Sequence, residues 1–214
     1  MRAATRLRHN EAMSTRALPA TFTTVHPLSS SQRERRQRLL IAARELASAG
    51  GYGAVTMHAV ADHAQLARAT VYRYFGSKDQ LLTAAGVEWA REIAEEQARG
   101  GIRVAGGSAA EQMAELMAAV IDHSAAELPL MSAMVSAIIS GDRTADRERR
   151  ALYAIMLERF DQIMGDGLPA EERADMAYLL GQVMLAALTS LCMLEQPAKL
   201  VRDMAIGAAH RLLS

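Results

Sequence analysis

The chain has 214 residues, 50% of them hydrophobic, and its 24 Lys and Arg residues balance 24 Asp and Glu residues. This length and apolar content suffice for one or two compact domains with a buried core. The single cysteine, Cys192, excludes an intramolecular disulfide framework and a cysteine-rich zinc module. No run approaches the roughly 18 consecutive apolar residues of a membrane span, so we expect a cytoplasmic protein that does not contact a membrane.

Charge is distributed unevenly along the chain. Residues 1–80 hold 12 Lys and Arg against 5 Asp and Glu, whereas residues 81–214 hold 12 against 19. A basic front half favours a polyanionic partner, although solvated surface charge can also segregate without any function.

The first 30 residues are rich in Arg, Ser and Thr, and they show no apolar periodicity. We expect a disordered basic tail over residues 1–30. A transit peptide has a similar composition, and a misjudged start codon would also explain the tail, but the apolar centre of a secretory signal is missing. The ordered chain is expected to begin near the stretch SSSQRERRQ.

From there, apolar residues recur at helical spacing. They predict a first helix that ends at Gly50 and Gly51, and a short second helix that Thr56 caps. A third short helix is expected from Ala67 to about Phe75, with Ala67, Val71 and either Tyr74 or Phe75 on its core face. Gly76 should end it, and Ser77 should cap the next helix.

Beyond Gly107 the pattern stays helical, with breaks at glycines and prolines. The fold class is therefore all-α. We assign residues 31–78 to a helix-turn-helix domain and residues 79–214 to a second helical domain. Helices in the second half are expected over residues 108–127, 129–140, 144–164, 169–194 and 197–213.

Two short helices joined by a tight connection, with a helix before and after, are typical of a helix-turn-helix. The second of them would present Arg68, Ala69, Thr70, Tyr72 and Arg73 away from the core. An arginine can pair bidentately with guanine, and a tyrosine hydroxyl can donate to a phosphate.

Other groups in this half suit the phosphates of a duplex. Thr56 and Lys78 stand at helix starts, where backbone N–H groups are free. Arg36 lies in an arginine cluster at the start of the first helix, where basic residues oppose the helix dipole. A DNA backbone would offset that repulsion, and a merely solvated basic end is the alternative.

Residues 51–82, GYGAVTMHAVADHAQLARATVYRYFGSKDQLL, resemble the DNA-binding domain of the TetR family of bacterial transcriptional regulators. Two positions depart from the family pattern: Gln65 replaces the usual turn glycine and Ala67 replaces the usual serine cap. The positions that match are Thr56, Val60, Ala61, Thr70, Val71, Tyr72, Tyr74, Phe75, Lys78 and Leu81.

The resemblance implies roles for individual residues of this segment. Val71 and Phe75 would be core, and His58 would lie at the edge of the second helix that faces DNA. Residues facing bases or the groove edge would be Arg68, Ala69, Thr70 and Arg73. Residues holding phosphates would be Thr56, Tyr72, Tyr74 and Lys78, with packing as the alternative for Tyr74.

The resemblance also implies a homodimer that reads palindromic half-sites roughly 34–36 Å apart, and a small effector that changes their spacing. The dimer interface is expected at Tyr178, Leu179, Val183, Leu188, Leu200 and Met204. Methionines suit an adaptable apolar pocket, although ordinary core packing is the alternative. The effector site is expected at Met113, Met117, Met134, Ile138, Met156 and Phe160.

We therefore expect a homodimeric repressor that a small apolar or amphipathic effector releases from its operator. The chain also looks like the actinobacterial repressors of sterol and lipid breakdown. Activation, or regulation without an effector, is the alternative, and the operator and target genes stay open. The sequence carries no enzyme motif, and His58 and His63 are poorly spaced for one metal, so neither an enzyme nor a metal or cofactor is expected. The acidic second half disfavours a DNA-packaging protein.

Overall fold

The computed structural model describes residues 29–99 and 107–214, so the expected basic tail lies almost wholly outside the described residues. Those residues contain helices and no strand, which confirms the all-α class. The elements are α1 (Ser30–Ala54), α2 (Met57–His63), α3 (Arg68–Tyr74), α4 (Lys78–Ala98), α5 (Ala109–Ala126), α6 (Leu128–Ile139), η1 (Arg143–Ala145), α7 (Asp146–Met164), η2 (Gly165–Gly167), α8 (Ala170–Cys192) and α9 (Ala198–Leu213).

Local chemistry sets several of these boundaries. Ser29 forms a capping box with Gln32 at the start of α1, and each group satisfies a free backbone N–H of the other. The backbone of α1 leaves the helical region at Gly50 and Gly51, and Gly51 has a positive φ of 65°. The predicted glycine stop is therefore confirmed, and only a short turn continues beyond it.

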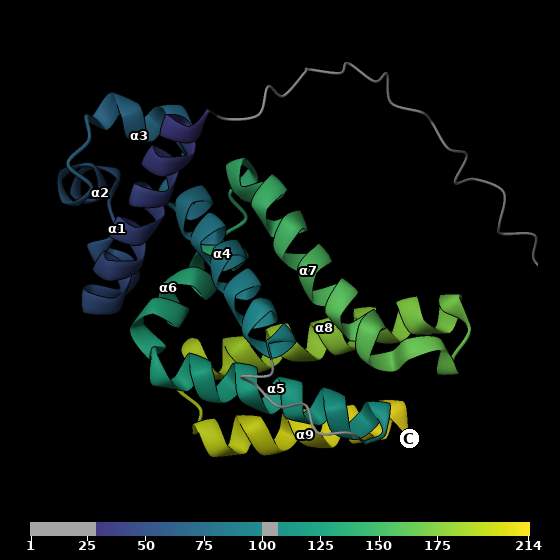
Figure 1. The fold of residues 1–214 in the computed structure, drawn as a ribbon. Coiled ribbons are helices and arrows are strands. Elements are labelled where there is room, and N and C mark those ends of the chain that lie inside the picture. The colour runs from purple at the N-terminus through teal and green to yellow at the C-terminus, as the bar shows by residue number, and fades with distance from the viewer. Residues whose placement is uncertain (1–28, 100–106) are drawn as a thin grey trace, which may run out of the picture.

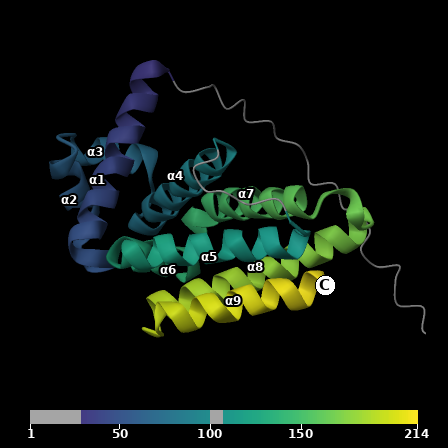
Figure 2. The ribbon, with the colours of Figure 1, turned by 60° about the horizontal axis from the view of Figure 1, so that its bottom comes forward.

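Two cores hold the molecule together. The first contains buried side chains of α1, α2, α3, α4 and α6, and the second contains those of α5, α7, α8 and α9. Figure 1 shows α1, α2 and α3 as a head at one side of the molecule, with α4 leading from it. Figures 1 and 2 both show α9 running alongside α5 and α8 at the other side.

The core of the head extends past the expected domain boundary at residue 78. Leu81 and Leu82 of α4 and Leu130 and Met134 of α6 are at most 1% exposed, and they belong to the same cluster as the buried residues of α1. The helices α1, α2 and α3 bury too little apolar surface on their own. Two helices that follow the head in sequence therefore complete its core.

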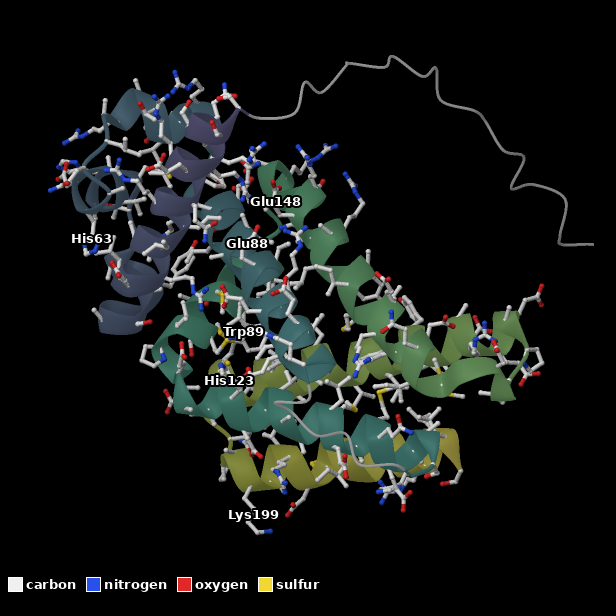
Figure 3. All side chains as sticks on the ribbon, in the orientation of Figure 1. His63, Glu88, Trp89, His123, Glu148 and Lys199 are labelled. Carbon is white, nitrogen blue, oxygen red and sulfur yellow. The ribbon has the colours of Figure 1, made fainter. Side chains whose placement is uncertain are left out.

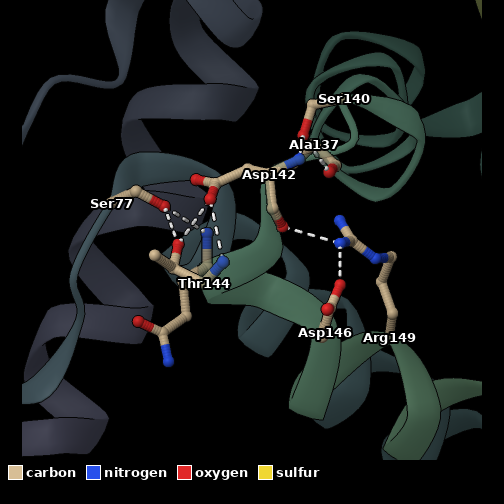
Figure 4. A network of polar contacts seen from close by, with 8 residues as sticks. Ser77, Ala137, Ser140, Asp142, Thr144, Asp146 and Arg149 are labelled. Carbon is tan, nitrogen blue, oxygen red and sulfur yellow. Dashed lines mark hydrogen bonds and ion pairs between the residues drawn. The ribbon is translucent and has the colours of Figure 1, made fainter.

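A polar clasp joins the start of α4 to η1 and α7 (Figure 4). The Ser77 hydroxyl lies 2.8 Å from the Thr144 hydroxyl, and the Thr144 hydroxyl and N–H both donate to Asp142 Oδ1, at 2.8 and 2.9 Å. One turn along α4, Gln80 Nε2 donates to Glu148 Oε1 at 3.2 Å. Hydrogen bonding from Ser77 and Thr144 lowers the pKa of Asp142.

Helix α8 differs from the expectation that no run of the sequence approaches the length and apolar character of a membrane span. Its 23 residues include an 18-residue window of mean hydropathy 1.4, which by length and composition is enough to cross a membrane. Core helices of soluble proteins pass the same test. Part of this helix is buried in the second core, at Ala177, Leu180, Met184 and Leu191.

Candidate nucleic-acid interface

The unit formed by α2, the turn and α3 is built by backbone hydrogen bonds and one side-chain cap. Thr56 Oγ1 accepts from the N–H of Ala59 at 3.0 Å, as the sequence predicts for an N-cap. After α2 the chain turns sharply, and the N–H of Leu66 donates to the carbonyl of Ala61 at 2.9 Å. The turn directs α3 across α2 with one face outward.

Helix α3 divides into the two faces that its sequence predicts. Val71 is fully buried, and Phe75, just after the helix, is 2% exposed. The opposite face is open: Tyr72 is 59% exposed, and Arg68, Ala69 and Arg73 are also exposed, with Thr70 half-buried at its edge. Ala67 was expected in the core but is exposed, because it precedes the first turn as the N-cap.

Arg68 is held by a chain of contacts that begins on α2. Its Nη2 lies 2.6 Å from His58 Nε2, and His58 Nδ1 lies 3.3 Å from Asp62 Oδ2. Because a guanidinium can only donate, His58 Nε2 is the acceptor, and the ring proton of the neutral imidazole is then on Nδ1, the nitrogen nearer Asp62. His58 therefore lies at the outward edge of α2, as expected, and orients Arg68 from there.

Lys78 is positioned by an aromatic ring from the end of α1. Its Nζ lies 3.6 Å from the centroid of the Tyr52 ring, in a cation–π contact. The Tyr52 hydroxyl donates to Asp79 Oδ1 at 2.5 Å. Burial, with that hydrogen bond and the charge of Asp79, raises the pKa of Tyr52 to about 12. Lys78 stays half-buried beside the outward face of the head.

Two residues expected at DNA also make contacts within the protein. Tyr74 is half-buried against the first core, and its hydroxyl oxygen is enclosed without a partner from residues 29–99 or 107–214, which favours the packing role left open for it. Arg36 Nη1 pairs with Glu88 at 3.4 Å, and its guanidinium stacks 5.6 Å from the Phe75 ring. Arg36 therefore joins α1 to α4 in this structure, and its DNA contact stays a prediction.

Two family models match this chain. Residues 39–85 match the one described as bacterial regulatory proteins, tetR family, and residues 106–213 match the tetracyclin repressor-like C-terminal domain. The chain belongs to the TetR family. It is therefore a transcriptional regulator with a DNA-binding helix-turn-helix head and not an enzyme.

Curated relatives share most of the length of this TetR-family chain. It is 35% identical over 161 residues to the HTH-type transcriptional repressor KstR of Mycobacterium tuberculosis, across 75% of this chain and 72% of that protein. It is 37% identical over 163 residues to the protein of the same name from Rhodococcus jostii, across 76% and 74%.

Solved structures show the same fold. A TetR transcriptional regulator from Rhodococcus sp. RHA1 superposes with a TM-score of 0.76 at 23% identity, over 86% of this chain and 97% of that one. The regulator FadR of Bacillus subtilis, solved in complex with stearoyl-CoA, superposes with a TM-score of 0.56 at 17% identity, over 83% and 97%.

The two departures from the TetR pattern have local costs in this structure. Gln65 adopts a positive φ of 52°, a conformation that glycine adopts without steric cost and that costs another residue about 1–2 kcal/mol. Ala67 has no side chain that can cap α3, and no side-chain cap is present. Neither change alters the outward face of the TetR head.

Most of the residues expected at an effector are divided between the two cores. Met134 belongs to the first core, whereas Met113, Met117 and Phe160 are buried in the second, where Met156 packs against them. Ile138 is half-buried on α6. An open pocket of about 400 Å³ lies among α5, α6 and the connection from α8 to α9, and none of the six residues lines it.

Large apolar side chains are exposed on both α8 and α9. We call this surface the α8–α9 face and define it by Tyr178, Leu179, Leu185, Leu200 and Met204, which are 38–67% exposed. It includes four of the six residues expected at a dimer interface. The other two, Val183 and Leu188, are half-buried and pack against the second core.

Sequence reasoning missed the supports behind these side chains. The spacing of His58 and Asp62, four residues apart on a helix, was a signal for their contact. Tyr52 carried no such signal, because its partners Lys78 and Asp79 lie 26 and 27 residues further along the chain.

Proposed function

We propose that this chain is a homodimeric transcriptional repressor of the cytoplasm, which binds palindromic operator DNA and is released by a small apolar or amphipathic effector. The outward face of α3 carries the proposal. Its arginines and tyrosine can contact DNA in a major groove, and its small alanine allows a close approach. The opposite side of α3 is buried in the core. The repressors named KstR, which match three quarters of this chain, support repression as the outcome.

The side chains of the head have separate roles in this proposal. Arg68, Arg73, Ala69 and Thr70 contact base edges or the groove wall. Residues that hold phosphates are Tyr72, Lys78 and Thr56.

The α8–α9 face supports the dimer. Tyr178 and Met204, from different helices, are 54% and 67% exposed, and several large exposed apolar side chains are typical of an interface between proteins. Pairing this face with its copy would form a four-helix seam around a two-fold axis. The two heads would then be fixed at one spacing, as a palindromic operator requires.

The second core supports an effector site. It contains Met113, Met117 and Met184, and flexible thioether side chains can rearrange around an apolar molecule. Two buried polar atoms on α4, Thr83 Oγ1 and Trp89 Nε1, have no hydrogen-bond partner among the described residues. An amphipathic effector that reached α4 could satisfy them, and FadR with its bound stearoyl-CoA shows that this fold can hold an acyl chain.

Trp89 shows how such an effector would act on the head. Its ring packs against His123 of α5 at a centroid distance of 5.6 Å, so α4 contacts the effector half as well as the head (Figure 3). Because Ser77 and Lys78 begin α4, a shift of this helix changes the position of the reading face.

The experiment is selection of duplexes from a random library by the purified protein. We expect one palindromic sequence, bound as a dimer and released on titration with stearoyl-CoA or with a sterol as probes. Equal binding to unselected duplexes would contradict sequence recognition, and release by neither probe would contradict the proposed effector class. A reporter gene behind the selected sequence separates repression from activation.

A further inference from the structure

Three arginines stand on the surface at the start of α7. Arg143, in η1, and Arg147 and Arg150, in α7, are all exposed. Arg147 and Arg150 are three residues apart on the helix and therefore share one side of it. Within residues 29–99 and 107–214, none of the three guanidiniums forms an ion pair. We call these three residues the α7 arginine face.

Within the described residues, the acidic side chains of the same segment contact other groups and form no ion pair with these three arginines. Asp142 accepts from Thr144, and Asp146 pairs with the half-buried Arg149. Glu148 accepts from Gln80, and its second carboxylate oxygen is buried. The acids therefore serve contacts within the protein, whereas the three arginines project positive charge into solvent.

The clasp places this charge beside the DNA-binding head. Thr144 follows Arg143 directly and lies 2.8 Å from Ser77, the residue before Lys78. Figure 1 shows the first turn of α7 at the same end of the molecule as α3 and the start of α1. Glu148, between Arg147 and Arg150 in sequence, lies at that end in Figure 3.

We propose that the α7 arginine face binds the backbone of the operator, at phosphates next to those that Lys78 holds. This inference rests on the proposed function, because it takes the same duplex as the occupant. Free guanidiniums beside a DNA-reading head complement the charge of a duplex, and an arginine binds phosphate without reading a base. The face therefore adds affinity and register, while base selection stays with α3.

The test compares two triple variants on the duplex that the wild type selects. Arg143→Gln, Arg147→Gln and Arg150→Gln together remove the charge and keep side-chain length. We expect binding roughly ten- to a hundredfold weaker near 0.15 M salt, and a salt slope that is smaller by about 0.9 for each lost phosphate contact. The preferred base sequence should not change. The Arg→Lys triple variant should keep most of the salt slope, because it keeps the charge.

Lys199→Ala is the matched control, since Lys199 is 86% exposed and lies far from Glu148 (Figure 3). A Gln triple variant with the salt slope of this control would overturn the inference, and so would a shift in its base preference. Ethylation of single phosphates in the selected duplex gives a second readout. Some ethylated phosphates should weaken binding of the wild type but not binding of the Gln triple variant.

The same experiment separates this inference from the proposed function. If Arg68→Ala loses the selected sequence while the Gln triple variant binds like wild type, the operator assignment holds and only the α7 arginine face is refuted. If the wild type prefers no duplex at all, the proposed function fails, and the inference fails with it.

Discussion

The outward face of α3 and the α8–α9 face are both exposed, yet they differ in chemistry. The first presents Arg68, Tyr72 and Arg73, whereas the second presents Tyr178, Leu179, Met204 and their apolar neighbours. Charged and hydrogen-bonding groups suit a hydrated polyanion, and apolar groups gain free energy only when a partner removes water from them. Both faces are accessible to a partner, and the side chains on each face indicate the chemical class of that partner.

The largest effect is expected from a charge on the α8–α9 face. Met204→Glu places a carboxylate in the proposed interface twice, once from each protomer, and an unpaired buried charge costs on the order of 3–5 kcal/mol. We expect a monomer by analytical ultracentrifugation and the loss of most operator affinity. Lys199→Ala, on the same helix, should stay dimeric. A dimeric Met204→Glu protein would show that this face is not the interface.

Removal of a base-reading side chain should have the next largest effect. Arg68→Ala and Arg73→Ala should each weaken binding to the selected operator by about 1–3 kcal/mol and relax base preference at one position of each half-site. Arg91→Ala is the control, because Arg91 pairs with Glu88 on the outside of α4. Full operator affinity in both head variants, measured by fluorescence anisotropy, would refute the assignment of this face.

A smaller effect is expected from the residue behind Arg68. His58→Ala removes the acceptor at 2.6 Å and should weaken operator binding several-fold, with preference relaxed at the same base as in Arg68→Ala. The two effects should not add in the double variant, because both act through one side chain. His63→Ala is the matched control, since His63 contacts Glu45 on the same head. Additive losses would show that His58 acts independently.

The smallest effect concerns the clasp and depends on pH. In the folded protein, hydrogen bonds lower the pKa of Asp142 below its ordinary value of 3.8. The ionised carboxylate therefore stabilises the fold above pH 3.8, and this stabilisation is lost as the pH falls through the pKa of the folded state. Urea unfolding should therefore show a stability gap between wild type and Asp142→Asn at pH 6 that narrows below about pH 4. A gap that is independent of pH would contradict a role for the carboxylate charge.

The sequence predicted the helices well because their signals are local. Ser108 and Glu111 form a capping box, so α5 begins one residue after its predicted start. The outward side chains of α3 follow from helical periodicity around Val71. Long-range contacts could not be predicted in this way. The contact of Arg36 with Glu88, for example, joins residues 52 positions apart in the chain and has no local signal. Met134 was grouped with Met113 because nothing local indicates that α6 packs in the head.

The shared core of the head has a consequence for how the chain can be divided. A fragment that ended at residue 78 would retain all of α1, α2 and α3, but it would expose the apolar surface that Leu81, Leu82, Leu130 and Met134 cover. Such a fragment would aggregate or remain unfolded, however complete its DNA-reading residues are. Exchange of reading heads between relatives would therefore require α4 and α6 to be transferred together with α1, α2 and α3.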